Sequence, residues 1–266
     1  MQDLLFMKQK DSMISNGPMN EKYIYLGKQE LLYMGKILSL SVHSHITWTL
    51  CLPLQGEIRY QSKDETYKTK KAFLIPPKVD HQIEGYGSYL AFVFFEKYSP
   101  YAPVISEGSK IINLDERELL PLKEALTELM QQKDKAKHNL TFILDNLHIP
   151  IQRKSILDDR ILLVQKLLVQ KDLETQISLV ELASSVGLSE SRLSHLFKEQ
   201  MGIPISSYRV WIRIRNLADA LKKNPKLTFA AHSSGFFDSS HLHRVFKQYF
   251  GINPKNVFLN SLVHWI

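Results

Sequence analysis

Two stretches of the chain carry one pattern: SRLSHLFKEQMGI at residues 191–203 and SHLHRVFKQYFGI at residues 240–252. Laid over each other, they share Ser, Leu, Phe, Lys, Gly and Ile at the same places. Leu and Phe recur at three- and four-residue steps, which is typical of one apolar face of a helix. A Gly directly after the last turn is a common helix stop. The sequence therefore predicts the same short helix twice.

A second, shorter helix is predicted ahead of each copy. The upstream segments LVELASSVGLSES and LTFAAHSSGFFDSS share the spacing Ala-x-x-x-Gly, at 183–187 and at 231–235. The small Ala lets two helices approach closely, and the Gly permits a tight exit from the first of them. Ser189 in the first copy, and Asp238 or Ser239 in the second, can cap the helix that follows. The order helix, turn, helix is thus expected twice.

The segment between the copies, IPISSYRVWIRIRNLADALKKNPK, predicts one long helix over 205–223. Pro204 suits the start of this helix and Pro225 follows its end. The two helix-turn-helix modules are then expected at about 177–202 and 227–251. A rigid connector would fix the distance between their second helices.

The solvent-facing sides of the two repeated helices are rich in hydrogen-bond donors and hold no acidic residue. They comprise Ser191, Ser194, His195 and Lys198 in the first helix and Ser240, His243, Arg244 and Lys247 in the second, with Arg192 and Ser239 at the margin. Arg binds guanine with two hydrogen bonds, and Ser and His reach base edges in the major groove. An ordinary solvated helix face is the alternative, but two matching faces favour DNA recognition.

Phosphate contacts are expected beside the base contacts. The candidates are Ser189, Lys198, Arg209 and Lys247. Arg209 rests only on the basic character of the connecting helix. Two helices held by one connector could enter successive major grooves about 34 Å apart.

Composition agrees with a polyanionic partner. The chain has 266 residues and a net charge of +7, and residues 156–266 hold 14 Lys and Arg against 9 Asp and Glu. The one cysteine, Cys51, excludes an intramolecular disulfide framework. Neither a signal peptide nor an apolar membrane span is evident. We therefore expect a soluble, intracellular protein without a membrane partner.

The first part of the chain reads as β-structure. Residues 20–105 contain several short runs of Ile, Leu, Val, Phe and Tyr between Gly, Pro, Asp and Lys clusters, which predicts a barrel or sandwich. Residues 114–132 change to a helical period, with Pro121 expected in the first turn. This helix either packs on the barrel or meets its twin in a dimer.

The motifs LSESRLSHLFKEQMGI and GFFDSSHLHRVFKQYFGINP resemble the two DNA-reading modules of the AraC/XylS family of bacterial transcription regulators, over about residues 165–258. LQGEIRY and AFLIPPKVDHQI are similar to the cupin-like sensing domain of that family. The resemblance implies that the polar residues at 191–195 and 239–244 read bases. It also implies a small-molecule effector, often polar, and a homodimer. It further implies a cytoplasmic, nucleoid-associated bacterial protein.

The expected fold is therefore α+β in two domains, a cupin-like β-barrel followed by helices and an all-α domain with two helix-turn-helix modules joined by a long helix. The expected boundaries are 1–110 for the sensing barrel, 111–150 for a helical dimerisation segment, 151–157 for a linker and 158–266 for the DNA-binding domain.

Three histidines raise the question of a metal. His43 and His45 share one face of a strand, and His81 follows a Pro-Pro motif. Metal-binding cupins usually add a Glu soon after the His pair, whereas ITWTLCLPL follows it here. We therefore expect no metal and no cofactor. The candidate effector pocket comprises His43, His45, Trp48, Tyr60 and His81. A barrel that binds nothing and only dimerises is the alternative.

The favoured function is that of a DNA-binding transcription regulator, for example an activator, and not of an enzyme. Its expected partners are double-stranded DNA, a small-molecule effector, a second copy of the chain and RNA polymerase. Two alternatives stay open at this point. One is a metal-dependent cupin enzyme with a helical appendage, and the other is an architectural DNA binder without an effector.

Overall fold

The computed structural model describes residues 21–27, 29–97, 99, 111–114, 116–131, 157–170, 177–259 and 263–265. Most of the expected linker and the second half of the expected dimerisation segment lie outside the described residues. None of the helices in the described part is long and apolar enough to cross a lipid bilayer.

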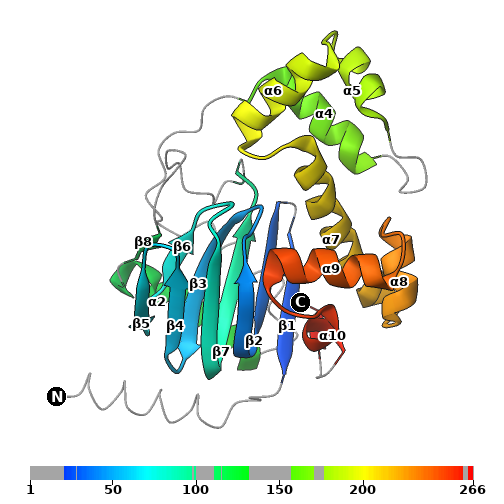
Figure 1. Cartoon of the computed structure of the whole chain (residues 1–266). Helices are drawn as coiled ribbons and strands as arrows, with labels where there is room; N and C mark the ends of the chain where they lie inside the picture. Colours follow the sequence, from blue (N-terminus) through cyan, green and yellow to red (C-terminus); the bar gives the residue numbers. More distant parts are fainter. Residues whose placement is uncertain are drawn as a thin grey trace, which may run out of the picture.

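The N-terminal half is a largely antiparallel sheet (Figure 1). Its strands are β1 (Lys22–Leu26), β2 (Glu30–His43), β3 (Trp48–Gln55), β4 (Ile58–Ser62), β5 (Thr66–Thr69), β6 (Phe73–Ile75), β7 (His81–Phe95) and β8 (Ile112–Asn113). The long strand β7 pairs with β3 near its end and with β4 near its start, so the sheet forks there. Register shifts in β2 add bends. A last strand, β9 (Val263–Trp265), returns from the far end of the chain to pair in parallel with β1.

The two faces of this sheet are covered by different partners. Helix α2 (Glu116–Gln131) packs on one face and buries Leu119, Leu122, Leu126 and Leu129 there. These leucines therefore pack against the sheet of the same chain. This is the first of the two arrangements expected for the helix, packing on the β-structure, and not contact with its twin in a dimer. Pro121 lies inside α2, five residues after its start, so the helix begins earlier than the sequence indicated.

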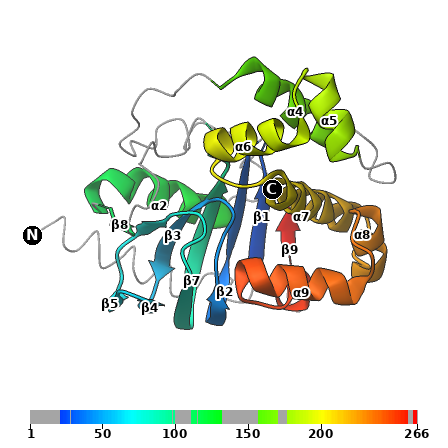
Figure 2. The same cartoon turned by 45° about the horizontal axis from the view of Figure 1, so that its top comes forward.

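The C-terminal part is helical, and this arrangement of a β-domain (β1–β8 and α2) and a helical domain (α4–α10) confirms the expected fold class. Its helices are α4 (Asp159–Gln170), α5 (Leu179–Ser185), α6 (Glu190–Met201), α7 (Ile205–Lys223), α8 (Leu227–Ser233), α9 (Ser239–Phe250) and α10 (Pro254–Phe258). Helix α7 connects the group formed by α4–α6 to the group formed by α8–α10 (Figures 1 and 2). Its bounds coincide with the predicted 205–223.

A buried carboxylate joins the two domains. Glu96, just after β7, is 5% exposed and accepts hydrogen bonds from three side chains of α7. The donors are the Tyr208 hydroxyl at 3.1 Å, the Trp211 indole at 2.8 Å and the Arg215 guanidinium at 2.9 Å. Arg215 also donates to the Gly27 carbonyl at 2.6 Å. Burial raises the pKa of Glu96, while Arg215 and the three hydrogen bonds oppose that shift. The β-domain therefore holds the middle of the connecting helix.

The C-terminal ends of α6 and α9 are also held by the β-domain. The Gly202 carbonyl after α6 accepts from the Lys78 ammonium at 2.7 Å. The Gly251 carbonyl after α9 accepts from the backbone N–H of Ser41 at 2.8 Å and from its hydroxyl at 3.0 Å. Donors at these ends satisfy carbonyls that have no partner within the helix. The approach at Gly251 is close, since a Cβ there would lie 2.5 Å from the Ser41 carbonyl oxygen and 2.5 Å from His43 Nδ1.

We predict that Glu96→Ala uncouples the domains. The change leaves Arg215 and two further donors without their acceptor, which should lower the free energy of unfolding by about 3–5 kcal/mol. Urea denaturation should then show two transitions in place of one. Glu84→Ala is the control, because its carboxylate pairs with Arg59 at 3.7 Å near the surface and its loss should cost at most about 1 kcal/mol. An unchanged midpoint for Glu96→Ala would contradict the role of this carboxylate.

We also predict that Gly251→Ala destabilises the protein more than Gly187→Ala does. Both glycines have a positive φ, +66° and +64°, so Ala costs about 1–2 kcal/mol at either position from backbone strain alone. No atom lies within 4 Å of a Cβ at Gly187, whereas a Cβ at Gly251 overlaps the backbone of Ser41. Overpacking should add roughly 1–3 kcal/mol at Gly251. Equal shifts of the melting temperature would show that α9 does not dock as closely as described.

Candidate nucleic-acid interface and sensing site

Helices α6 and α9 are built alike at their ends. The Ser189 hydroxyl accepts the Arg192 N–H at 3.3 Å at the start of α6, and Asp238 accepts the His241 N–H at 2.6 Å at the start of α9. Each helix ends on a Gly in the left-handed conformation. Ser234–Asp238 joins α8 to α9, one residue more than joins α5 to α6. The caps fix where each helix begins, and hence which side chains face outward.

The apolar stripes of both helices point into their own modules. Leu193, Leu196 and Phe197 of α6 are buried, as are Leu242 and Phe246 of α9. The predicted base-reading residues lie on the opposite sides. Exposed are Ser191, Arg192, His195, Ser240 and Arg244, and partly exposed are Ser194, Ser239 and His243. The predicted phosphate contacts Ser189, Lys198 and Lys247 are exposed as well.

Three neighbours modify these faces. His195 Nδ1 lies 3.7 Å from the Glu199 carboxylate, so an acidic residue reaches the margin of the first face. His243 Nδ1 lies 3.4 Å from the Asn253 amide. Arg209 donates to the backbone carbonyl of Ile177 just before α5, and it therefore joins α7 to the first module. Burial lowers the pKa of this guanidinium.

Phe237 was not among the sequence-derived candidates. It lies in the turn directly before the Asp238 cap and is 86% exposed, while the adjacent Phe236 is buried. The sequence could have indicated this exposed residue through the consecutive Phe236 and Phe237, because two neighbouring side chains at a turn point in different directions and only one of them packs inward here. An exposed apolar side chain beside a reading helix can contact the methyl group of thymine.

A cluster of three buried histidines lies inside the β-domain. The ring centroids of His43, His45 and His81 are 4.3–4.9 Å apart, and Tyr60 stacks on His81 at 5.8 Å. Four of the five expected effector-pocket residues thus come together. Trp48 does not join them, because it packs in the apolar cluster on the opposite face of the sheet, under α2.

Each histidine of this cluster is held through Nδ1 by a backbone carbonyl. The acceptors are Ser41 at 2.8 Å for His43, Tyr249 at 2.7 Å for His45 and Val79 at 2.8 Å for His81. Burial, aided by the neighbouring imidazoles, lowers the pKa of His43 to about 3 and that of His45 well below its usual value. Burial likewise lowers the pKa of His81 to about 4. All three rings are therefore neutral at pH 7.

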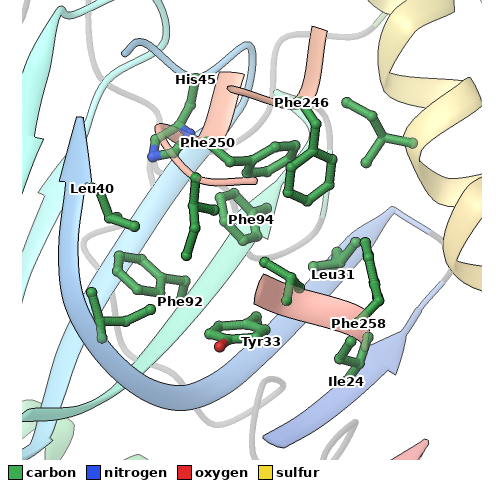
Figure 3. A pocket seen from close by; sticks show the side chains of 14 residues that line it. Ile24, Leu31, Tyr33, Leu40, His45, Phe92, Phe94, Phe246, Phe250 and Phe258 are labelled. Carbon is green, nitrogen blue, oxygen red and sulfur yellow. The ribbon is translucent and has the colours of Figure 1, made fainter. Parts of the chain in front are cut away.

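An apolar cavity lies between the β-domain and the second module. Its walls come from β1, β2, β7, α7, α9 and α10, and Figure 3 shows Phe92, Phe94 and Leu40 facing Phe246 and Phe250 across it. His45 is at one end, so the cavity and the histidine cluster share a residue. The volume is about 50 Å³. Side chains of both domains thus define a small, apolar space.

Comparison with known proteins identifies the helical part. Residues 182–259 match the family model described as "Helix-turn-helix domain". The chain is 25% identical over 228 residues to the probable transcriptional regulator LumQ of Photobacterium leiognathi, covering 81% of this chain and 91% of LumQ. It is 36% identical over 83 residues to the arabinose operon regulatory protein of Salmonella typhimurium, covering 30% of this chain and 29% of that protein. Several such matches span less than a third of the relatives' length.

The fold as a whole also has a solved counterpart. ToxT from Vibrio cholerae O395 superimposes with a TM-score of 0.57 at 12% identity, covering 88% of this chain and all of that chain. At this identity the likeness concerns the fold, and it includes both the β-domain and the helical domain. Residues 182–259 therefore form a helix-turn-helix domain, and the chain resembles transcription regulators of the AraC type in this domain and shares with ToxT a β-domain followed by a helical domain.

Proposed function

We propose that the protein regulates transcription by binding double-stranded DNA at specific sequences through α6 and α9. The observation that carries this proposal is the pair of capped helices, one in each module joined by α7, that both expose Ser, His, Arg and Lys side chains. Arg192 and Arg244 would read base edges, and Lys198 and Lys247 would contact phosphates. The excess of basic residues in this half supports the same partner.

Regulation would act through the docking of the β-domain. This domain contacts α7 at Glu96 and the C-terminal ends of α6 and α9 at Gly202 and Gly251. A change in that docking alters the relative placement of the two reading helices without touching DNA. Both helices must fit successive grooves at once, so a small shift of one of them weakens binding.

The effector is proposed to be apolar, in contrast to the polar metabolite that the family resemblance implied. The cavity between the domains is lined by Ile, Leu, Val and Phe side chains, with His45 and Tyr33 as its polar members. A ToxT structure contains a bound unsaturated fatty acid, which supports a ligand of this class. A cavity of about 50 Å³ is too small for such a molecule, so the ligand would have to separate α9 and α10 from the sheet.

The remaining partners follow from the family and are proposals of the same kind. The protein would act in the bacterial cytoplasm as a homodimer, and activation would require contact with RNA polymerase. Because the leucines of α2 pack on the sheet, a dimer contact by this helix would use its exposed side, where Leu120 is 45% exposed.

We predict that Arg244→Ala and Lys247→Ala weaken DNA binding in different ways. Arg244→Ala should cost about 1–3 kcal/mol on the preferred site and relax the base preference at one position. Lys247→Ala should weaken all sequences alike and reduce the salt dependence by about one phosphate contact. The measurement is selection from a random DNA pool, followed by footprinting and salt titration of the selected sites.

Lys63→Ala is the control for this experiment, because Lys63 is an exposed cation of the β-domain. It should change neither affinity nor preference. Unchanged base preference in Arg244→Ala would mean that a different side of α9 faces the DNA. Diffuse protection of DNA without any consensus would favour the architectural alternative.

We predict that Leu40→Phe blocks binding of a long-chain unsaturated fatty acid. Leu40 lines the cavity, whereas Leu52 is equally buried on the other face of the sheet, so Leu52→Phe adds the same volume elsewhere. Binding can be followed by tryptophan fluorescence, because two tryptophans lie beside cavity residues. The ring centroids of Trp211 and Phe94 are 6.5 Å apart, and those of Trp265 and Phe258 are 6.3 Å apart, and Phe94 and Phe258 both line the cavity. Equal affinity in the two variants would place the ligand outside this cavity.

A further inference from the structure

Each histidine of the cluster has one ring nitrogen whose lone pair is without a partner among the described residues. A backbone carbonyl can only accept, so each Nδ1 that it contacts must carry the proton. In a neutral imidazole the other nitrogen, Nε2, then has a free lone pair. The Nε2 atoms of His43, His45 and His81 are all buried and lack a hydrogen-bond partner among the described residues. Three buried acceptors without a donor require an explanation.

The arrangement fits a metal ion better than it fits an effector. One ring nitrogen from each histidine lies within 4.8 Å of the others. Nitrogen ligands bind Zn²⁺ at about 2.0–2.1 Å, so around one tetrahedral ion they lie about 3.4 Å apart. The widest separation in the set therefore has to close by at most about 1.4 Å when an ion binds. The three carbonyls already fix the tautomer and the ring orientation that ligation needs, as outer partners do in known metal sites.

The missing Glu does not exclude this site. Three imidazoles alone hold Zn²⁺ in some proteins and leave a fourth position open for water or another ligand. Neutral nitrogen ligands without a carboxylate select borderline ions such as Zn²⁺ over Mg²⁺ and Ca²⁺, which prefer oxygen. The usual motif of metal-binding cupins has four ligands, whereas the three histidines of this chain form a three-ligand set.

We propose that His43, His45 and His81 bind one divalent ion of the Zn²⁺ class through Nε2, and that the bound ion strengthens the docking of α9 on the β-domain. The site itself does not depend on the proposed DNA binding. Its coupling to α9 follows from the partner of His45, the Tyr249 carbonyl in the last turn of that helix. An ion on Nε2 withdraws electron density from the ring, so Nδ1–H becomes a stronger donor to this carbonyl.

The neighbouring contacts point the same way. His43 is held by the Ser41 carbonyl, and the N–H and hydroxyl of Ser41 hold the Gly251 carbonyl directly after α9. An ion that orders His43 therefore also orders the end of β2, where Ser41 donates two hydrogen bonds to the C-terminal end of α9. Because coupling is reciprocal, the docked protein should bind the ion more tightly than the undocked protein.

The first experiment tests the site in the full chain. Calorimetric titration of the metal-free protein with Zn²⁺ should show about one ion per chain, and X-ray absorption of the loaded protein should show three imidazoles at about 2.0–2.1 Å. His81→Gln should lower the affinity at least about tenfold, and His232→Gln, at an exposed histidine of α8, should leave it unchanged. Circular dichroism checks that His81→Gln is folded.

Two results would overturn the site. One is the absence of Zn²⁺ binding by the wild-type protein, which would leave water as the occupant of the cluster. The other is an absorption spectrum dominated by oxygen ligands or by fewer than three imidazoles, and this readout does not depend on any variant. Neither result involves DNA, so a failure of the proposed function would be seen separately in the DNA selection.

The second experiment tests the coupling. Zn²⁺ should slow hydrogen exchange at the Ser41 amide, which donates to Gly251, and should leave the Cys51 amide inside the sheet unchanged. If the exchange rate of the Ser41 amide is unchanged by Zn²⁺, the ion is bound without influence on α9.

Discussion

A single buried carboxylate, Glu96, holds the middle of the helix that joins the two modules to the β-domain. A carboxylate can leave water only if donors replace its hydration, and here Tyr208, Trp211 and Arg215 supply them from three successive turns of α7. Because hydrogen bonds are directional, three donors on one helix fix its rotation as well as its distance from the sheet. The modules at the two ends of α7 are then placed relative to the β-domain by the orientation of one helix.

Local features were readable from the sequence because they depend on residues close together in the chain. The bounds of α7 follow from its apolar period between Pro204 and Pro225, and the cap at Ser189 from residue type and position. Long-range features were not readable in this way. Glu96 meets α7 more than a hundred positions along the chain, and no periodicity marks such a contact.

The candidate pocket illustrates the same limit within the β-domain. Side chains alternate between the faces of a sheet, and the choice of the inner face depends on what covers each side. Trp48 faces α2, whereas His43, His45, Tyr60 and His81 face the interior. Residue type suggested all five as pocket residues, but only the cover provided by α2 and by the helical domain separates Trp48 from the rest. The carbonyl of Tyr249, as a backbone group, gave no sequence signal.

His45 lies beside both proposed ligand sites, the apolar cavity and the metal site, and it is also bound to α9. Its ring closes one end of the apolar cavity, its Nδ1 is bound to α9, and its Nε2 belongs to the histidine cluster. An apolar ligand that separates Phe250 from Phe94 would pull the last turn of α9 away from His45, whereas an ion on Nε2 would hold it there. The two ligands would therefore oppose each other through one hydrogen bond, and the position of the second reading helix would report the balance between them.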